Sequence, residues 1–192
     1  MSHDSNKNQR RSIRLKDYDY SQAGAYFLTI CTYNRKCLLG EVINGEMVLN
    51  ELGKVVEREW LRATEIRSNV ELDEFIILPN HIHSIIVVNE SNVGATCRSP
   101  EGEGTSPLRK GPRSASIGAI LAGFKSAVTK RINELRCTPY TPVWQRNFYE
   151  HVIRNEDDLD EIREYIVNNP LKWDLDSENP NNVGATSRSL RK

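Results

Sequence analysis

The sequence predicts an α+β fold, in which a central antiparallel sheet of about four or five strands carries helices packed on it, with an additional β-hairpin. Short runs of alternating apolar residues, rich in aromatic and β-branched types, predict the strands. Other segments have apolar residues at helical spacing. These segments follow one another as strand, hairpin, helix, two strands, helix, strand and helix. This order is typical of helices covering an antiparallel sheet.

The N-terminal part of the fold is predicted to be β-structure. Residues 25–34 alternate in the manner of a strand and contain several aromatic and β-branched side chains. The pair Asn44-Gly45, flanked by residues 37–42 and 46–49, is the strongest hairpin signal in the chain.

A helix and two strands are predicted next. From Asn50, a residue type that caps helices well, apolar residues recur at helical spacing over residues 52–61. Two apolar runs, 75–78 and 81–88, are separated by Pro79-Asn80, which predicts two strands joined by a turn or an irregularity.

The last elements are a helix, a strand and a further helix. Residues 114–135 carry one apolar stripe, and residues 144–153 have the composition of a strand. Asn155 and the acidic residues after it predict a helix start, where the helix dipole favours negative charge. Asn169-Pro170 predicts the end of that helix, because the residue before proline avoids the α region.

The chain divides into one domain with loose ends. We expect a basic N-terminal arm over residues 1–18, a folded domain over residues 19–175 and a disordered tail over residues 176–192. Residues 90–113 lack periodicity and are rich in Asn, Gly, Ser and Pro, which predicts a flexible loop within the domain.

Composition restricts the classes of function. No apolar stretch is long enough to span a membrane and the basic N-terminus has no apolar core, so we expect a cytoplasmic protein without a membrane partner. The four cysteines form no Cys-x-x-Cys pair, which argues against a zinc knuckle or a dithiol redox site.

The charge of the chain is segregated although its net value is +0. Lys and Arg concentrate in residues 1–18 and 104–136, whereas Asp and Glu concentrate in residues 156–164. A polyanion responds to the electrostatic field of the charges near it, so such a chain can bind nucleic acid although its net charge is zero. The alternative, that these are ordinary solvated faces, stays open on charge alone.

The segment His81-Ile82-His83 is the first candidate site. Because side chains alternate along a strand, both imidazoles point to the same face and lie close enough to share one divalent ion. The rest of this strand is apolar, where unpartnered polar groups are costly. The alternative is two half-exposed strand histidines without a metal.

Tyr165 and Asn169 form the second candidate site. At spacing i and i+4 they are neighbours on one helix face, so a phenol nucleophile would lie beside an amide oxygen that can act as a third metal ligand. Two imidazoles and an amide oxygen suit Mg²⁺ or Mn²⁺ bound jointly with a phosphate. The alternative is a tyrosine at the edge of the apolar face with Asn169 as a helix cap.

The combination of His81-Ile82-His83 with Tyr165-x-x-x-Asn169-Pro170 resembles the single-tyrosine HUH transposases, and most of all the REP-associated tyrosine transposases. Segments 11–20, 72–80, 124–126 and 144–155 also resemble sequences of this family. The resemblance covers roughly residues 10–175, apart from the loop.

The resemblance implies a function and a set of roles. Residues 19–175 would form a single-tyrosine transposase domain, with the His-x-His strand in the middle of an antiparallel sheet and the tyrosine helix packed across it. His81, His83 and Asn169 would bind the metal, Mg²⁺ or Mn²⁺. Tyr165 would attack single-stranded DNA, such as a hairpin from an imperfect palindrome, and form a 5′-phosphotyrosine before the strands are rejoined.

Several basic residues could contact DNA phosphates; they are Arg11, Arg14, Lys16, Lys125, Arg146 and Arg154. Such contacts position the strand but do not distinguish one base from another. Tyr149 and His151 lie on one face of a predicted strand and are accessory candidates, although a structural role for His151 is an equal alternative. Trp144 and Phe148 are expected to pack in the core rather than to stack on bases.

Two other functions stay open. The chain could be a domesticated DNA hairpin-binding protein without transposition. It could also be a metal-dependent hydrolase, which would need acidic ligands that Glu71, Asp73 or Glu74 would supply. A monomer and a homodimer are both compatible with the sequence.

Overall fold

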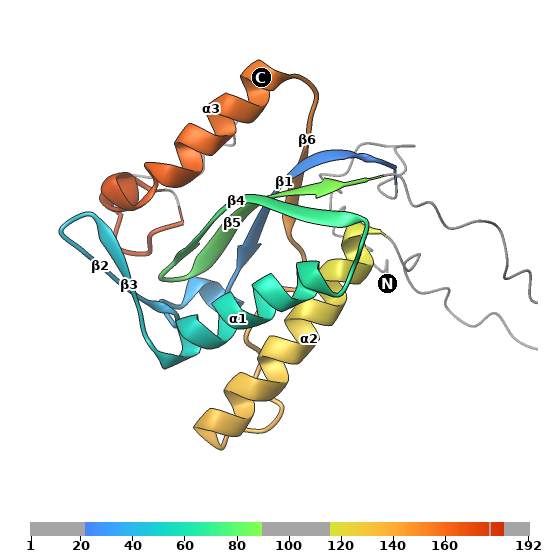
Figure 1. Ribbon diagram of the computed structural model, residues 1–192. Coiled ribbons are helices and arrows are strands. Elements are labelled where there is room, and N and C mark those ends of the chain that lie inside the picture. The colour runs from blue at the N-terminus through green and yellow to red at the C-terminus, as the bar shows by residue number, and fades with distance from the viewer. Residues whose placement is uncertain (1–21, 90–115, 177, 183–192) are drawn as a thin grey trace, which may run out of the picture.

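The computed structural model describes residues 22–89, 116–176 and 178–182 (Figure 1). The predicted basic arm, including Arg11, Arg14 and Lys16, and the predicted loop 90–113 lie outside the described residues. So do residues 177 and 183–192 of the predicted tail.

Four antiparallel strands form the central sheet in the order β4-β5-β1-β6. Their bounds are Gly24–Cys31 for β1, Val70–Leu78 for β4, His81–Val88 for β5 and Tyr149–Ile153 for β6. The hairpin is a separate sheet of β2 (Gly40–Ile43) and β3 (Glu46–Leu49). The α+β prediction is therefore confirmed, and β5 is an internal strand, as expected.

Helices cover both faces of the sheet (Figure 1). α1 (Glu51–Glu65) and α2 (Ile117–Arg136) pack against each other on one face, and α3 (Glu156–Val167) lies across the other. Two short 3-10 helices, η1 (Tyr33–Arg35) and η2 (Pro170–Leu175), follow β1 and α3. Among the described residues, no helix combines the length and the apolar character that crossing a bilayer requires.

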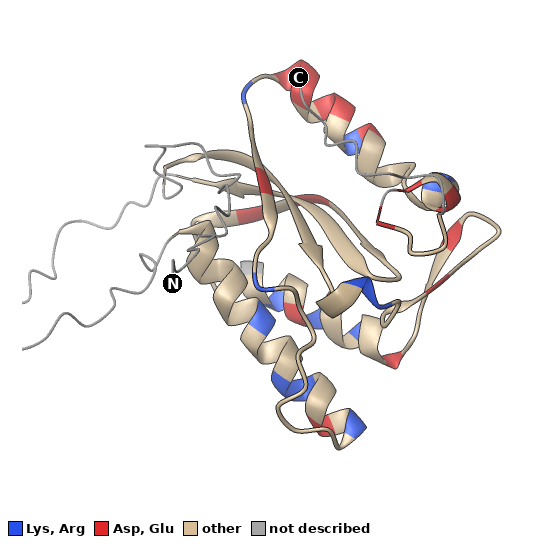
Figure 2. Ribbon diagram, turned by 180° about the vertical axis from the view of Figure 1, so that it is seen from behind, with Lys and Arg blue, Asp and Glu red and all other residues tan. Residues whose placement is uncertain are grey.

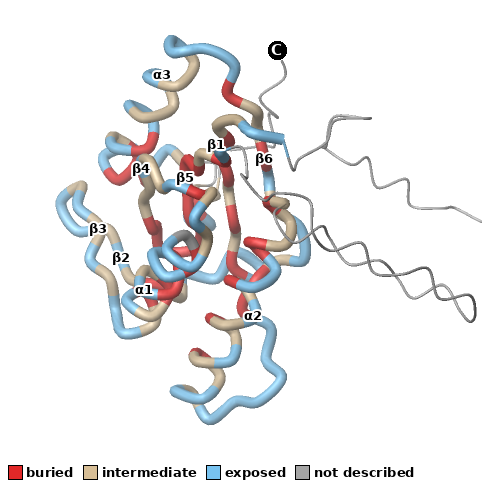
Figure 3. The backbone as a smooth tube through the Cα atoms, turned by 45° about the vertical axis from the view of Figure 1, so that its right-hand side comes forward, coloured by how far each residue is buried: buried red, intermediate tan, exposed pale blue. Residues whose placement is uncertain are grey.

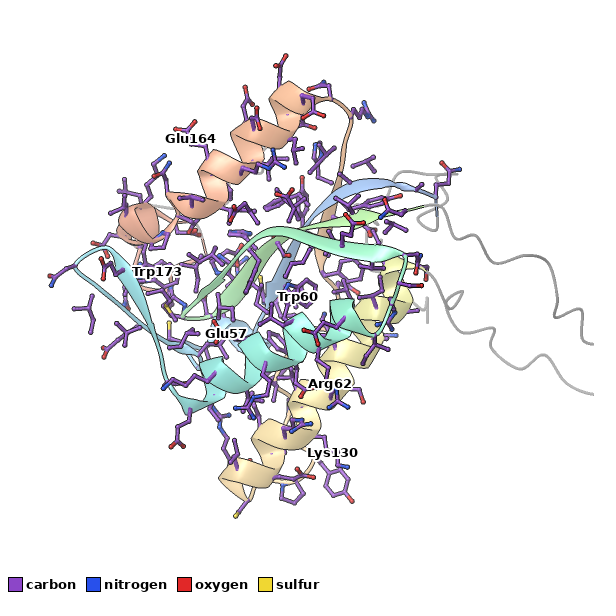
Figure 4. All side chains as sticks on the ribbon, in the orientation of Figure 1. Glu57, Trp60, Arg62, Lys130, Glu164 and Trp173 are labelled. Atoms are coloured by element: carbon purple, nitrogen blue, oxygen red, sulfur yellow. The ribbon has the colours of Figure 1, made fainter. Side chains whose placement is uncertain are left out.

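The alternation of side chains along the strands produces two apolar clusters of unequal size. Figure 3 shows buried residues along the strands of the central sheet. The larger cluster lies between the sheet and α1 and α2, where Trp60 packs against Phe124 with ring centroids 4.8 Å apart and its indole N–H donates to Ser84 Oγ (Figure 4). The smaller cluster lies under α3 and contains Phe27 and Ile166. The small cluster leaves part of this second face of the sheet available for polar side chains.

Local signals placed the helix starts correctly. The Asn50 side chain accepts hydrogen bonds from the backbone N–H groups of Leu52 and Gly53, and the Asn155 side chain accepts one from Asp158. In the hairpin, Asn44 and Gly45 have φ values of 53° and 81°, the left-handed conformation that this turn requires.

The predicted strand over residues 144–153 is wrong in its first half, because β6 begins only at Tyr149. The carbonyl oxygens of Gln145 and Asn147 accept hydrogen bonds from Lys125 Nζ of α2 instead of joining a strand ladder. Trp144 forms an isolated bridge with Thr32 and is buried against Phe124, so its expected core role is confirmed.

The predicted disordered tail does not begin at residue 176. After η2 the chain folds back through turns, and Asn179 is buried with its side-chain amide donating to Trp173 O. The backbone carbonyl of Glu178 accepts a hydrogen bond from Asn80 Nδ2 at 2.6 Å. The hydrogen bond from Asn80 connects this segment to the central sheet, and local periodicity cannot predict it because its two partners are 98 positions apart.

Candidate metal and tyrosine site

The two imidazoles of β5 lie on the face of the sheet that α3 covers, with His81 and His83 opposite Cys31 and Thr29 of β1. Both histidines are buried, so the half-exposed alternative is wrong. Their Nε2 atoms are 2.9 Å apart. Two nitrogen ligands at about 2.1 Å from one ion, separated by a right angle, would lie about 3 Å apart. The spacing therefore fits a shared metal ion.

Hydrogen bonds to the other ring nitrogens orient the two imidazoles. The amide of Asn80 donates to the carbonyls of Arg35 and Glu178, so its Oδ1 faces His81 Nδ1 at 2.7 Å and accepts from it. Thr29 Oγ1 lies 2.9 Å from His83 Nδ1. With the protons on Nδ1, both Nε2 lone pairs are free to bind a metal, which is the usual arrangement around metal-binding histidines.

Burial keeps both histidines neutral. Desolvation, and then the nearby Arg35 cation, lower the pKa of His81 to about 3. Desolvation and the neighbouring His81 also lower the pKa of His83. Since only neutral imidazole binds a metal, this pair is competent at neutral pH.

Tyr165 projects from α3 towards the same point. Its Oη lies 3.2 Å from His83 Nε2, and its ring packs edge-on against Phe27 with centroids 6.1 Å apart. The residue is nevertheless 42% exposed, so a substrate can reach it. Burial of the hydroxyl and the nearby Asp176 carboxylate raise the pKa of Tyr165 to about 12. The phenol is therefore protonated at neutral pH.

Asn169 lies close to Tyr165, although α3 ends at Val167 and Asn169 precedes η2. Burial raises the pKa of both Tyr165 and Asp176, and the hydrogen bonds that the Asn169 side chain makes to them offset part of that rise. The Oδ1 atom of Asn169 is buried without a hydrogen-bond partner. An orphaned buried oxygen is costly, and a bound cation would satisfy it.

Asp176 is the residue that the sequence analysis missed. Its Oδ2 lies 4.0 Å from His81 Nε2, and the ligand atoms of His81, His83 and Asp176 all lie within 4.8 Å of one another. Burial raises the pKa of this carboxyl. Trp173, which packs near His81 with ring centroids 6.0 Å apart, brings the segment over the site (Figure 4). The one sequence feature that could have indicated this residue is that its carboxylate follows Asn169-Pro170 closely in the chain.

Two of the three acidic residues expected to serve a hydrolase site have partners elsewhere, and none of the three belongs to the group formed by His81, His83 and Asp176. Glu71 accepts a hydrogen bond from Asn89, and Asp73 forms a two-atom contact with Arg163. The Arg163 contact, with distances of 2.6 and 2.9 Å, joins α3 to β4 and so helps to position the helix that carries Tyr165.

The donor set suits a hard or borderline divalent cation. The ligand atoms of His81, His83 and Asp176 lie close enough together to share one ion, and Asn169, whose side chain hydrogen-bonds to Asp176, has a buried amide oxygen without a partner. Two imidazole nitrogens and a carboxylate oxygen can hold a divalent cation and leave positions open for phosphate oxygens. The residues present therefore fit a divalent metal ion.

The accessory candidates lie beside the site rather than in it. The Tyr149 ring packs edge-on against Phe27, with centroids 6.3 Å apart. His151 Nε2 lies 3.1 Å from Asp158 Oδ2, so this histidine links β6 to α3. The structure thus gives His151 a structural contact.

The basic candidates differ in their surroundings. Lys125 uses two of its donors on backbone carbonyls, and burial lowers its pKa to about 8. Arg146 and Arg154 are exposed. Of these three residues, the two arginines are therefore the more available to a phosphate.

Replacing Thr29 by valine is expected to weaken Mn²⁺ binding by about 10- to 100-fold, because the hydroxyl that orients His83 is lost while the shape suited to a strand is kept. Titration calorimetry with MnCl₂ measures the change. Thr29→Ser retains the hydroxyl and should bind as the original protein does; equal weakening in both variants would contradict an orienting role.

Comparisons with known proteins give one relative of high similarity. No family model matches the chain. The chain is 43% identical, over 167 residues, to an uncharacterized protein of Haemophilus influenzae (strain KW20 / Rd), covering 87% of this chain and 91% of the relative.

A second protein of the same organism, named as a REP-associated tyrosine transposase, is 26% identical over 164 residues, which cover 80% of this chain and 74% of the relative. The solved structure of a REP-associated tyrosine transposase bound to a REP hairpin has the same fold, with a TM-score of 0.55 and 20% identity. That match covers 84% of this chain and 74% of the other. In sequence and in fold the chain is therefore similar to REP-associated tyrosine transposases.

Proposed function

We propose that this protein is a metal-dependent strand transferase that cleaves and rejoins single-stranded DNA through a 5′-phosphotyrosine on Tyr165. One observation carries the proposal: the exposed phenol of Tyr165 has its oxygen 3.2 Å from Nε2 of one of two buried, paired imidazoles. A nucleophile and a metal site are thereby within reach of a single phosphate group.

The proposed substrate is a single-stranded DNA hairpin, such as one formed by an imperfect palindrome. The solved relative is bound to a REP hairpin, which supports this class of substrate. The segregated charge described above is compatible with it, because basic surfaces attract the phosphate backbone regardless of the net charge.

His81, His83 and Asp176 would hold the metal, with Asn169 Oδ1 as a further ligand. When bound, a divalent ion supplies Lewis-acid polarisation of the scissile phosphate and stabilises charge on the departing oxygen. The protein contributes a fixed geometry: Phe27 packs against the rings of both His83 and Tyr165, which holds the phenol beside the ligands.

The covalent step exchanges one phosphodiester for another, so a phosphodiester bond is kept throughout. Tyr165 Oη forms a bond to phosphorus while the bond from phosphorus to the 3′-oxygen breaks. The phenol loses a proton and the departing 3′-oxygen gains one, so the products are a 5′-phosphotyrosine and a free 3′-hydroxyl. Another 3′-hydroxyl can attack the phosphotyrosine in the reverse sense, so rejoining requires no ATP.

A metal-dependent hydrolase is the second candidate, and Asp176 is the observation that favours it, because such an enzyme needs an acidic ligand or base beside the histidines. In that mechanism water would attack, and Tyr165 would not become covalently linked to DNA. A hairpin-binding protein without catalysis is the third possibility.

One experiment distinguishes the three. The protein is incubated with MnCl₂ and a 3′-labelled single-stranded hairpin and then separated on a denaturing gel. We expect the label to migrate with the protein, and chelation of Mn²⁺ to abolish this adduct. Label released only as a shorter free oligonucleotide would indicate a hydrolase. DNA that stays uncut on the denaturing gel but migrates with the protein on a native gel would indicate a binding protein, and either outcome would refute the proposal.

A further inference from the structure

We propose that an open hollow along α2 binds the single strand that leads away from Tyr165, with its phosphates on Lys130 and Arg146 and a base stacked on Tyr140. This inference rests on the proposed function. The hollow has a volume of about 510 Å³ and lies between α2 and the segment of residues 140–146.

The charge of the hollow is of one sign. Lys125, Lys130 and Arg146 line it, and none of the described residues that line it is acidic. Lys130 and Arg146 are exposed, whereas Lys125 is engaged with backbone carbonyls. Figure 2 shows Lys and Arg along α2, whereas Asp and Glu gather at the start of α3. The local field therefore attracts a polyanion even though the net charge of the chain is zero.

Lys130 lies where two hollows meet. It also lines a second hollow, of about 560 Å³, between α1 and α2, together with Arg62 and Arg131 (Figure 4). The lining of this second hollow also contains Glu59 and Glu134, and Arg131 pairs with Glu59 at 2.8 Å. The cations available to the phosphates of a bound strand are therefore those of the first hollow.

Tyr140 supplies a stacking surface at the rim. It is 99% exposed, and its φ of 65° lies in the left-handed region, which is unfavourable for a residue with a side chain. The segment is held there by Asn133 of α2, whose Nδ2 donates to Thr141 O and whose O accepts from Thr138 N. An exposed aromatic ring held beside cations is the arrangement on which unpaired bases stack.

The hollow lies at the edge of the sheet that leads to the tyrosine. The ring of Phe27 packs edge-on against both Tyr165 and Tyr149, with centroids 6.1 and 6.3 Å apart. Tyr149 is the first residue of the edge strand β6, and it follows Arg146 by three positions, at most about 11 Å of chain. A strand held at Tyr165 can therefore pass over Tyr149 to the hollow.

The test measures binding alone. A fluorescein-labelled 20-nucleotide oligo-dT is titrated with the protein in EDTA at several salt concentrations, and fluorescence anisotropy gives the affinity. Lys130→Gln/Arg146→Gln is expected to weaken binding and to reduce the slope of log affinity against log salt by about 1.4, because two phosphate contacts are lost. Lys54→Gln/Arg58→Gln removes the same charge from exposed positions of α1 that line neither hollow, and it should retain the original slope.

The second part of the test examines base stacking and uses substitutions at one residue. Tyr140→Ala is expected to weaken binding by about 5- to 150-fold, whereas Tyr140→Phe keeps the ring and should keep the affinity. All the substituted residues are exposed, so thermal melting should be unchanged. Equal slopes for the two double variants, or equal affinities for Tyr140→Ala and Tyr140→Phe, would overturn the proposal.

A competition experiment distinguishes nucleic acid from an acidic protein partner. Unlabelled polyglutamate and unlabelled oligo-dT are each added to the labelled complex. If polyglutamate displaced the DNA as well as oligo-dT does, the proposal would be overturned, because the hollow would then fit an acidic protein. EDTA removes the divalent ions that cleavage would need, so the binding assay measures affinity alone. A failure to form the covalent adduct would therefore leave the measured affinities unaffected. Conversely, loss of the hollow's contribution would not abolish an adduct formed at saturating DNA.

Discussion

Tyr165→Phe should abolish the covalent protein–DNA adduct, with a fall in rate of at least about 10³-fold, on the scale seen when a catalytic nucleophile is removed. The phenol oxygen is the only atom removed, so no group remains to form the phosphotyrosine. Its contacts are with His83 Nε2 and the Asn169 side chain, and the residue is partly exposed. Folding and DNA affinity should therefore change little. The measurement is the rate of adduct formation with a 3′-labelled hairpin under single-turnover conditions.

Tyr149→Phe is the matched control, because Tyr149 packs against the same Phe27 ring but makes no contact with His83 that the described structure records. We expect it to retain adduct formation. If Tyr149→Phe rather than Tyr165→Phe lost the adduct, the nucleophile would be the residue at the start of β6, and the proposed role of Tyr165 would be wrong.

Asp176→Asn should weaken Mn²⁺ binding by about 100-fold, and adduct formation at limiting Mn²⁺ should fall with it. The change removes the anionic member of the ligand set while keeping the size of the side chain. The magnitude is at the upper end of the effects known for groups that support a metal site. Titration calorimetry with MnCl₂ measures the affinity.

Glu178→Gln tests whether the effect of Asp176 is ligation or only local charge. Glu178 belongs to the same segment and pairs with Arg35 at 2.7 Å, but it lies outside the group formed by His81, His83 and Asp176. We expect its substitution to change Mn²⁺ affinity by less than about threefold, as for a partly exposed ion pair. Equal weakening in both variants would argue that the carboxylate acts through the field and does not bind the metal.

Much of the fold follows from short-range patterns. Strand alternation, the Asn44-Gly45 turn and the caps at Asn50 and Asn155 depend on residues that are neighbours in the chain, and each appears in the structure as predicted. The period of two along β5 also placed His81 and His83 on one face, because that relation depends only on strand geometry.

The errors arose where distant contacts outweigh local preference. Gln145 and Asn147 have strand-like neighbours, but their carbonyls accept hydrogen bonds from Lys125 of α2. Residues 176 and 178–182 show no periodicity, yet the carbonyl of Glu178 accepts a hydrogen bond from Asn80 beside the site. Each of these partners lies 20 or more positions away in the sequence, so a short window along the chain does not contain both.

Local spacing and the order of the motifs were enough to predict most of the elements, the common face of the two histidines and the family resemblance. The contact of the Tyr165 hydroxyl with His83, and the position of Asp176 in a group that could hold a metal ion, became apparent from the folded chain alone. The reason is physical: the packing of α3 and η2 against the sheet sets those distances, and it is governed by long-range apolar contacts and hydrogen bonds.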